Sequence, residues 1–466
     1  MAENDSPDAD QYDAIIIGSG QGGGPLSTAL VTAGKRTALI EREYIGGTCI
    51  NTGCTPTKTM VASARVAYLA RRGPEYGVEI AGETIDQTVI RQRKRDVVAS
   101  FEAGSRRAIE AGHVDIIMGE ASFTGPKSIE IRLREGGTRK LRADLFVIDT
   151  GSRPAEPPLP GLNSVPHFNS TTLTEVDEVP EHLLILGGGY IAVEFGQMFR
   201  RFGSRVTIVE RGAQLLGRED PEIAAALQRI FEEDGIDVLL HTTVNAVSAD
   251  DDGEVCLDVK VGDEVLTLTG SHLLVAIGRT PNTEALNLPA AGVEVTDRGV
   301  IKVNERLETS ANGIYALGEI AGSPAFTHIS YDDFRVLRAN LIEGKNRTTK
   351  GRMLPYTVFT DPQLGRIGMT EREARATYPN VKIANMPMAN VARAVETGES
   401  RGTIKAVVDA DTEQILGAAV LGVEGGEIMA MVQLAMMGGI RVSVLRDAIF
   451  AHPTLAELLN NLFSGM

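Results

Sequence analysis

The sequence of 466 residues has little of three things that mark other classes of protein. It contains only three cysteines, which argues against a disulfide-stabilised scaffold of the secreted type. No apolar run reaches the length of a membrane-spanning helix. Basic residues number 46 against 62 acidic ones, and a formal charge of −16 argues against a nucleic-acid or anionic-membrane partner.

The start of the chain also lacks basic residues. Its first ten residues include four acidic ones, so they do not resemble the basic start of a secretory signal peptide. We expect a short solvated tail there and a location in the reducing cytoplasm. The length predicts about three domains, and 43% hydrophobic with 23% charged residues is typical of a globular protein.

Two of the three cysteines, Cys49 and Cys54, lie five positions apart in the segment 46–58. A short loop between two thiols closes easily, so the pair can cycle between dithiol and disulfide. Lys58 follows Cys54 by four residues, the spacing that shares one face of a helix. The alternatives are a structural disulfide and half of a zinc site. The low cysteine content argues against the first, and no second Cys/His pair at ligand spacing supports the second. We predict a redox-active pair and no resident metal.

Two segments, 13–23 and 183–192, each run from an apolar strand into a glycine-rich turn. Each is followed by a helical stretch and by a second strand that ends in an acidic residue, Glu41 or Glu210. The two copies keep a constant offset of 169 residues. Such glycines allow a pyrophosphate to approach a helix N-terminus, and the acid accepts a hydrogen bond from an adenosine ribose. We therefore predict two dinucleotide sites, with fingerprint glycines Gly18, Gly20, Gly23, Gly187 and Gly189.

The two copies also end alike, at residues 145–154 and 273–282, but here the offset is 127. The first copy therefore holds 42 more residues than the second (169 − 127). The Cys49/Cys54 segment lies within this extra length. The simplest interpretation places a flavin beside the cysteines and a nicotinamide nucleotide in the second copy.

With these motifs the chain resembles the class I pyridine nucleotide–disulfide oxidoreductases, the family of glutathione reductase, dihydrolipoamide dehydrogenase and mercuric reductase. The resemblance extends from Tyr12 to Met466 and includes residues 309–318 and 451–457. Residues 326–334 are most similar to a mercuric-reductase-like branch that includes copper-reducing proteins.

The resemblance implies an α/β fold with two Rossmann-like doubly wound domains and a C-terminal α+β dimerisation domain. Runs that look like strands at 403–408 and 414–421, between helical stretches, agree with the last of these. The expected domains are an FAD-binding domain (1–153), an NAD(P)-binding domain (154–282), a central segment that completes the FAD site (283–351) and the dimerisation domain (352–466).

The resemblance also implies roles for the residues around the thiols. Cys49 would attack the substrate disulfide, and Cys54 would be the thiol beside the flavin. Lys58 would lie near flavin N5 and pair with Glu194. Tyr190 resembles the gate that covers the flavin face where nicotinamide docks.

His452 is similar to the family's acid–base histidine, oriented by Glu457 and donated across the interface of a homodimer. A protonated imidazole there would favour a nearby thiolate. Pro453 suits the first position of a helix, so we expect His452 at a helix entrance. The resemblance also suggests a cis His452–Pro453 bond.

The remaining implied contacts are those with cofactors. For FAD they are Gly18, Gly20, Gly23, Glu41, Thr48, Lys58, Ala121, Thr150, Gly151, Arg279, Gly318, Glu319 and Thr327. For the nicotinamide nucleotide they are Gly187, Gly189, Tyr190, Ile191, Glu194, Glu210 and Gly278. Because the Glu210 carboxylate would repel a 2′-phosphate, we expect NAD(H) to be favoured over NADP(H).

The chain departs from the family at several points. Glu319 stands where the family usually has Asp. Residues 463–466 contain no cysteine pair of the kind found in mercuric reductases, so we do not expect efficient mercuric reduction. We expect Cys256 to be inert in a strand and residues 250–253 to form a hairpin turn. Four methionines of an apolar helical segment should pack in the core of the protein: Met429, Met431, Met436 and Met437.

Three functions remain open at this point. The first is an FAD-dependent NAD(P)H:disulfide oxidoreductase, or a dihydrolipoamide-type dehydrogenase working in the opposite direction, with a small-molecule or protein disulfide or dithiol as substrate. The second is a flavin-dependent reductase of a metal ion, Hg(II) or Cu(II), or of a quinone. The third is a redox-sensing or scaffold subunit. The pair His452 and Glu457 favours the first, because electron transfer to a metal or a quinone needs no thiol acid–base group.

Overall fold

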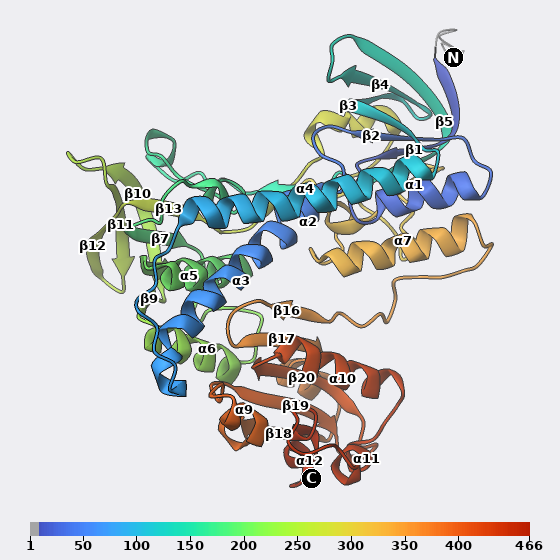
Figure 1. Cartoon of the computed structure of the whole chain (residues 1–466). Helices are drawn as coiled ribbons and strands as arrows, with labels where there is room; N and C mark the ends of the chain where they lie inside the picture. Colours follow the sequence, from blue (N-terminus) through green and yellow to red (C-terminus); the bar gives the residue numbers. More distant parts are fainter. Residues whose placement is uncertain (1–8) are drawn as a thin grey trace. The chain divides into compact units, whose positions relative to one another are not determined.

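The computed structural model describes residues 9–466, and these form two compact units (Figure 1). The first unit contains the described residues up to Thr59 together with 92–155 and 278–352. The second contains 60–91, 156–277 and 353–466. Residues 1–8, most of the expected solvated tail, lie outside the described part. Within residues 9–466 no helix combines the length and the apolar character needed to cross a membrane.

The first unit is built on one six-stranded sheet. Parallel pairing gives the order β3–β2–β1–β5–β15, and β4 pairs antiparallel with β3 and β5. The register places Ala14 opposite Thr37 on one side and Leu145 on the other. The strands are β1 (Asp10–Ile17), β2 (Thr37–Glu41), β3 (Asp115–Gly125), β4 (Ser128–Leu133), β5 (Thr138–Ile148) and β15 (Ile314–Ala316). Two short strands, β6 (Ser152–Pro154) and β14 (Arg279–Pro281), form a separate antiparallel pair.

Apolar side chains cover both faces of this sheet, because successive residues of a strand point to opposite faces. Ile16 of β1 packs in one cluster with Leu30 and Phe334, whereas Ile15 packs in another with Phe146. The helices α1 (Gly23–Thr32) and α7 (Thr327–Leu341) run side by side over the first face, blue and orange in Figure 1. The short helix α2 (Gly47–Asn51) follows β2.

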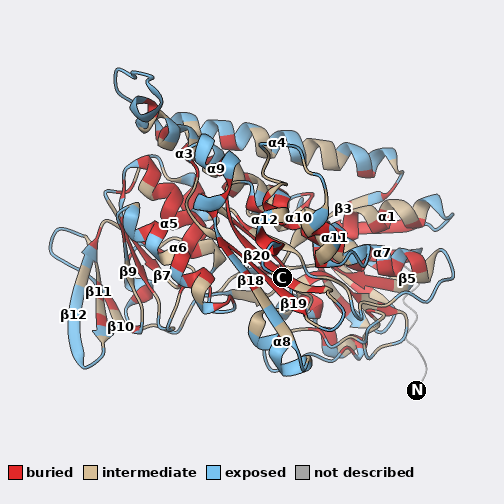
Figure 2. Cartoon of the chain, turned by 90° about the horizontal axis from the view of Figure 1, so that it is seen from below, coloured by how far each residue is buried: buried red, intermediate tan, exposed pale blue. Residues whose placement is uncertain are grey.

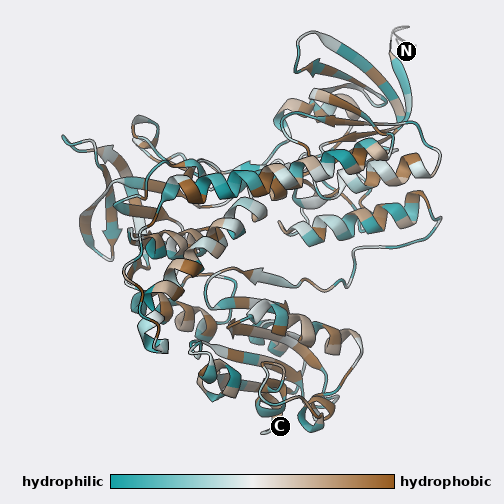
Figure 3. Ribbon diagram, in the orientation of Figure 1, coloured by the Kyte–Doolittle hydropathy of each residue, from teal (hydrophilic) through white to brown (hydrophobic). Residues whose placement is uncertain are grey.

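Two long helices pass from one unit into the other. They are α3 (Cys54–Arg71) and α4 (Gln87–Ala111). The helix α4 carries mainly hydrophilic residues along its length (Figure 3).

The second unit contains three sheets. A parallel sheet has the order β13–β7–β8–β9, an antiparallel one β10–β11–β12, and a five-stranded antiparallel one β16–β17–β20–β19–β18. The strands are β7 (His182–Leu186), β8 (Arg205–Val209), β9 (Ile236–Leu239), β10 (Thr242–Ala249), β11 (Val255–Val261), β12 (Glu264–Gly270), β13 (His272–Val275), β16 (Tyr356–Val358), β17 (Gln363–Gly368), β18 (Val381–Pro387), β19 (Thr403–Asp409) and β20 (Ile415–Gly422). The strands β19 and β20 are buried over most of their length (Figure 2).

The helices of this unit bury their apolar faces against these sheets. Helix α5 packs on β7 and β8, and α10 packs on β17 and β20. The helices are α5 (Tyr190–Phe202), α6 (Pro221–Glu233), α8 (Glu371–Thr377), α9 (Ala392–Glu396), α10 (Gly425–Met437), α11 (Val442–Asp447) and α12 (Leu458–Phe463). The predicted core position of Met437 is wrong: it is 66% exposed at the end of α10, whereas Met429 is buried and Met431 and Met436 pack against the core.

Other local predictions are confirmed. The strands expected at 403–408 and 414–421 are β19 and β20. Residues 250–253 form the turn between β10 and β11, where the Asp250 N–H donates to the Glu254 carbonyl at 3.0 Å. Cys256 lies in β11, as predicted.

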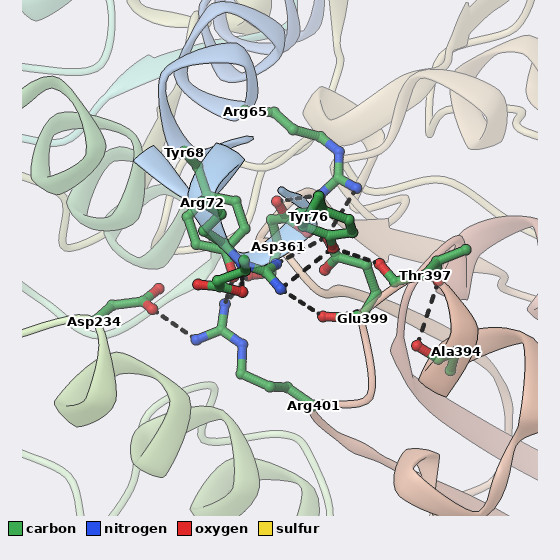
Figure 4. A network of polar contacts seen from close by, with 12 residues as sticks. Arg65, Tyr68, Arg72, Tyr76, Asp234, Asp361, Ala394, Thr397, Glu399 and Arg401 are labelled. Carbon is green, nitrogen blue, oxygen red and sulfur yellow. Dashed lines mark hydrogen bonds and ion pairs between the residues drawn. The ribbon is translucent and has the colours of Figure 1, made fainter. Parts of the chain in front are cut away.

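A polar network joins the second half of α3 to the C-terminal sheet (Figure 4). The buried Glu399 accepts from Arg72 at 3.1 Å. Asp361 pairs with Arg201 at 2.5 Å and also with Arg65, which together hold the pKa of Asp361 below its usual range although burial raises it. These contacts fix residues 60–71 of α3, which belong to the second unit, to the sheet of that unit.

Candidate active site: two glycine turns, a dithiol and a histidine

The first glycine turn connects β1 to α1, and its backbone is tightly packed. Gly18 has φ +102°, and a Cβ there would lie 2.2 Å from the Asp149 carbonyl oxygen. A Cβ on Gly47, before the cysteines, would lie 2.9 Å from the Gly20 Cα. Only glycine fits these positions, and the turn ends at Gly23, the first residue of α1. This packing fits the close approach of a dinucleotide phosphate.

Glu41 ends β2, as the fingerprint predicts, and is held toward the turn. Its Oε2 accepts from the Ser19 N–H at 3.0 Å and from the Ser19 hydroxyl at 2.6 Å. Its Oε1 accepts from the Glu43 N–H at 2.8 Å. A carboxylate offers about four lone-pair sites. Glu41 therefore keeps the capacity to accept a ribose hydroxyl, which fits the predicted FAD contact.

Arg279, Ser152 and Glu319 form a hydrogen-bonded group in the same unit. Arg279 Nε donates to the Ser152 hydroxyl at 2.7 Å, and that hydroxyl donates to Glu319 Oε1 at 2.7 Å. Burial lowers the pKa of Arg279, which the nearby Glu319 and Cys54 partly oppose. The longer side chain of Glu319 is therefore accommodated by Ser152. Thr150 lies two residues before Ser152, and its hydroxyl donates to the Asn282 carbonyl at 2.9 Å.

Two acidic residues near this turn were not predicted from the sequence. Asp149 follows β5, and its Oδ2 accepts from the Gly23 N–H at 2.7 Å. Burial raises the pKa of Asp149 well above its usual range, and Glu319 and Asp333 add to this. Asp333 accepts from the Gly318 N–H at 2.8 Å, so it fixes the residue before Glu319. The position of Asp149 directly after a buried strand was the available signal.

The two cysteines lie at consecutive helices. Cys49 is within α2 and half-buried, and Cys54 begins α3 and is exposed. The two cysteines are thiols that are not joined in a disulfide. The Thr327 hydroxyl at the start of α7 lies 3.3 Å from Cys54 Sγ. Lys58 is one helical turn beyond Cys54 in α3, as predicted.

Cys49 is the thiol of the pair whose pKa is raised. A hydrogen bond with Cys54 raises the pKa of the Cys49 thiol, and so does its burial, while Thr327 and Lys58 act in the opposite direction. Because the thiolate is the reactive form, Cys49 needs a base before it can attack a disulfide.

The second glycine turn repeats the geometry of the first between β7 and α5. Gly187 has φ +109°, and a Cβ there would lie 2.7 Å from the Ala276 carbonyl oxygen. Glu210 follows β8; its Oε2 accepts from the Gly188 N–H at 2.5 Å and its Oε1 from the Gly212 N–H at 2.6 Å. The acid that follows the second strand thus closes on the turn in both copies. This geometry fits a second dinucleotide.

Helix α5 begins directly after this turn with Tyr190 and Ile191. Glu194, one turn further along α5, is buried, and its Oε1 accepts from the Phe359 N–H at 2.8 Å. Lys58 belongs to the first unit and Glu194 to the second, so the predicted pairing of these two residues stays a prediction.

His452 and Glu457 lie together near the C-terminus. His452 Nδ1 is 2.8 Å from Glu457 Oε2, and the His452 side chain is 67% exposed. The His452–Pro453 peptide bond is cis, as suggested. The prediction that Pro453 begins a helix is wrong, because α12 begins at Leu458 with Glu457 as its N-cap. His452 therefore stands in a loop, and the carboxylate of Glu457, which makes no capping hydrogen bond to α12, holds its ring.

The remaining predicted residues take the following places. In the first unit, Thr48 lies in α2, the buried Ala121 in β3, Gly151 (φ +60°) after β5, Gly278 (φ +143°) before β14, and Gly318 (φ +74°) after β15; Gly189, in the second unit, is the N-cap of α5. The first unit thus contains the flavin fingerprint and the dithiol. The second contains the nicotinamide fingerprint and His452.

Comparison with known proteins agrees with this geometry. The family model "Pyridine nucleotide-disulphide oxidoreductase" matches residues 12–333, and the model of the dimerisation domain of the same family matches 354–463. A probable pyridine nucleotide-disulfide oxidoreductase, RclA of Escherichia coli, is 39% identical over 459 residues, 97% of this chain and 99% of the relative. A dihydrolipoyl dehydrogenase of Thermus scotoductus is 35% identical over 453 residues, 96% of this chain and 95% of the relative.

A solved structure is similar over the whole chain. It is described as the Cu(II) complex of the HOCl-induced flavoprotein disulfide reductase RclA from Escherichia coli, with a TM-score of 0.89 and 38% identity, and the match covers 98% of this chain and 100% of that one. These matches confirm the predicted family, fold class and enzyme class. The chain belongs to the pyridine nucleotide-disulfide oxidoreductase family and is a flavin-dependent enzyme that takes a pyridine nucleotide and acts on sulfur groups.

Proposed function

We propose that the protein uses NADH to reduce a disulfide through FAD and the pair Cys49 and Cys54. The observation that carries the proposal is the coupled dithiol at the start of α3, beside Thr327, in the unit that contains the first glycine turn. We also propose the domain boundaries at 153, 282 and 351. A location in the reducing cytoplasm remains our proposal and rests on the low cysteine content.

FAD would be held in the first unit by the turn at Gly18, by Glu41 and by Arg279. When bound, FAD supplies the transfer of two electrons from a nicotinamide to the disulfide of the pair. The group of Arg279, Ser152 and Glu319 offers one cation and one carboxylate for the polar parts of such a cofactor. Burial raises the pKa of Asp149 next to the turn, which disfavours a negative charge where phosphate would approach.

The thiols then carry the chemistry on sulfur. In the reduced pair, His452 takes the proton of Cys49, and the Cys49 thiolate attacks one sulfur of the substrate disulfide. A mixed disulfide forms, and the first substrate thiolate leaves and takes the proton from His452. The Cys54 thiolate then attacks Cys49 Sγ and restores the Cys49–Cys54 disulfide, and the second substrate thiolate leaves with a proton that reaches it from solvent through His452. One disulfide is thus reduced to two thiols, and one dithiol is oxidised.

We propose that His452 supplies the proton for the leaving thiolates and that Glu457 orients it. The carboxylate contacts Nδ1, which leaves Nε2 to face the reacting group. The family places this histidine in the partner's site, so we propose a homodimer. The match of residues 354–463 to a dimerisation domain and the 67% exposure of His452 support this.

The test is an anaerobic reduction of the purified, FAD-loaded protein with one equivalent of NADH. We expect a long-wavelength absorbance shoulder beside the flavin band, because the proposal puts the Cys54 thiolate next to the flavin as an electron donor. Cys54→Ser should remove the shoulder and leave FAD bound. Cys256→Ser, the third cysteine, is the control and should keep it. A shoulder that survives Cys54→Ser contradicts the assignment.

A second candidate function is reduction of Cu(II), and the same dithiol favours it. Thiolates are preferred ligands of Cu(I), and the similar RclA structure is a Cu(II) complex. Among residues 9–466 no group of three His, Cys, Asp or Glu residues could hold a metal ion. Copper would thus be a substrate at the two thiols, with two Cu(II) reduced to Cu(I) for each NADH oxidised. Turnover with Cu(II) and a Cu(I)-specific chelator, compared with disulfides and quinones, decides between the acceptors.

A further inference from the structure

Tyr190, the first residue of α5, is part of a hydrogen-bonded chain within the second unit. Its hydroxyl is hydrogen-bonded to Tyr356, and the two ring centroids are 5.5 Å apart at 44°. The Tyr356 hydroxyl donates to Glu219 Oε1. Because a hydroxyl has one proton, the Tyr190 hydroxyl must donate to the Tyr356 oxygen. The chain therefore runs from Tyr190 through Tyr356 to the Glu219 carboxylate.

The carboxylate at the end of this chain is fixed. Glu219 is 5% exposed, and its N–H donates to the Leu216 carbonyl at 2.8 Å. The Leu216 N–H in turn donates to the Gly188 carbonyl at 2.9 Å, within the second glycine turn. The loop of Glu219 is therefore tied to the turn that precedes Tyr190.

Strand β16, which provides Tyr356, is also held to α5 at a second point. The Phe359 N–H donates to Glu194 Oε1 at 2.8 Å, and Glu194 is one helical turn from Tyr190. Tyr190 and Glu194 therefore both face the segment 356–359. The first turn of α5 is positioned by this segment rather than by the parallel sheet alone.

Charged residues of the five-stranded sheet support the same loop. Arg366 of β17 donates to Asp220 Oδ2 at 2.7 Å and lies 3.7 Å from Glu219 Oε2. Lys405 of β19 is 1% exposed, lies 3.5 Å from Asp220 and donates to Glu371 at 2.6 Å. Arg366 is thus the cation beside the Glu219 carboxylate, and Lys405 supports the neighbouring Asp220.

We propose that Tyr356 and Glu219 are positioning residues for the nicotinamide site: they fix the Tyr190 hydroxyl and so set the affinity for the pyridine nucleotide. The proposal rests on the proposed role of the second glycine turn. Tyr190 resembles the gate that covers the flavin face where nicotinamide docks, so its ring must leave that face when the nucleotide binds. The hydrogen bonds that fix the Tyr190 hydroxyl oppose this movement and so lower the affinity. The strand β16 belongs to the segment matched by the dimerisation domain, so that domain contributes to cofactor affinity.

The experiment compares Tyr356→Phe and Glu219→Ala, which removes the acceptor, with the parent as FAD-loaded, full-length protein. The affinity of the oxidised enzyme for NAD⁺ is measured by calorimetry, and the KM values for NADH and for the disulfide are measured separately. Each variant should strengthen NAD⁺ binding about two- to tenfold, the range expected for the loss of one hydrogen bond. The KM for the disulfide should not change. Tyr378→Phe, which removes a hydroxyl of the same unit outside the network, is the control and should bind as the parent does.

A double variant separates positioning from general destabilisation. If Tyr356 acts through Tyr190, then Tyr190→Phe with Tyr356→Phe should bind NAD⁺ no more tightly than Tyr190→Phe alone. Additive gains would overturn the proposal. So would parent-like binding by Tyr356→Phe and Glu219→Ala while Tyr190→Phe binds more tightly. If Tyr190→Phe and Glu210→Ala both bind as the parent does, the second turn is not the nucleotide site, and the proposed function fails instead.

Discussion

Replacing Glu210 should change the choice between NADH and NADPH. In the proposed complex its carboxylate faces the adenosine ribose, where NADPH carries a phosphate. Two unit charges about 4 Å apart near a protein surface interact by about 4 kcal/mol before screening by salt. If one third to two thirds of this remains, the discrimination against NADPH is about 1.4–2.8 kcal/mol, or about ten- to a hundredfold.

The structure also shows why the replacement must be chosen with care. Both carboxylate oxygens of Glu210 accept backbone N–H groups, from Gly188 at 2.5 Å and from Gly212 at 2.6 Å. Glu210→Ala removes the charge and both acceptors, so it should also loosen the turn. Glu210→Gln removes the charge and keeps one acceptor. The shift in selectivity common to both variants is the electrostatic part, and the loss of stability found only in the alanine variant is the structural part.

The assay is kcat/KM for NADH and NADPH with one disulfide substrate, at low and moderate salt. We expect the parent to prefer NADH and Glu210→Gln to shift toward NADPH, more strongly at low salt. The exposed Arg211 and Arg218 lie close in sequence and could meet a phosphate, so Glu210→Gln with Arg218→Ala is the matched variant. An NADPH preference in the parent, or an unchanged ratio in Glu210→Gln, would refute the reasoning.

Three other perturbations have defined outcomes. Asp361→Asn removes a buried partner of two arginines and should lower the free energy of unfolding by about 3 kcal/mol in denaturant titrations. Its folded-state pKa is depressed, so the contribution is present above pH of about 4 and is lost as the pH falls further. Asp149 has a raised pKa in the folded protein, so its contribution to stability is largest at low pH and declines as the pH rises. Asp149→Asn should therefore flatten the dependence of the melting temperature on pH and raise the melting temperature at neutral pH. Mixing His452→Ala chains with Cys49→Ser chains should restore activity, because each heterodimer then has one complete site.

Each of these has a result that would contradict it. A loss of less than about 1 kcal/mol in Asp361→Asn would mean that the arginines find other partners. Parallel pH profiles for Asp149→Asn and the parent would show that Asp149 ionises normally in the folded protein. Confirmed heterodimers without activity would place His452 and the cysteines of one site in the same chain.

Much of the fold was predictable because its central strands are continuous apolar runs. The strands expected before the two glycine turns, and those expected to end in Glu41 and Glu210, correspond to β1, β7, β2 and β8, and no end differs by more than three residues. Strands of a parallel sheet are buried on both faces, so their sequences are continuous apolar runs that are easily recognised. The glycines after them were equally readable, because only glycine fits where a Cβ would meet backbone.

Local signals failed where contacts distant in sequence decide the structure. Pro453 has a backbone that suits the start of a helix. The contact between His452 and Glu457 instead organises a loop, and the helix begins only at Leu458. Met437 lies in an apolar segment but at its exposed end. No local pattern distinguishes either case.

The buried acidic residues also could not be assigned a role from the sequence alone. Asp149, Glu219 and Asp333 read as ordinary polar residues in the sequence, and each is buried in the structure. What gives each one a function is a partner from another segment: the Gly23 N–H, the Tyr356 hydroxyl and the Gly318 N–H. All three partners lie at or beside a turn proposed to bind a cofactor. A fingerprint therefore identifies the cofactor class, whereas the residues that hold the fingerprint in place, and that should tune affinity from one family member to the next, become visible only in the folded chain.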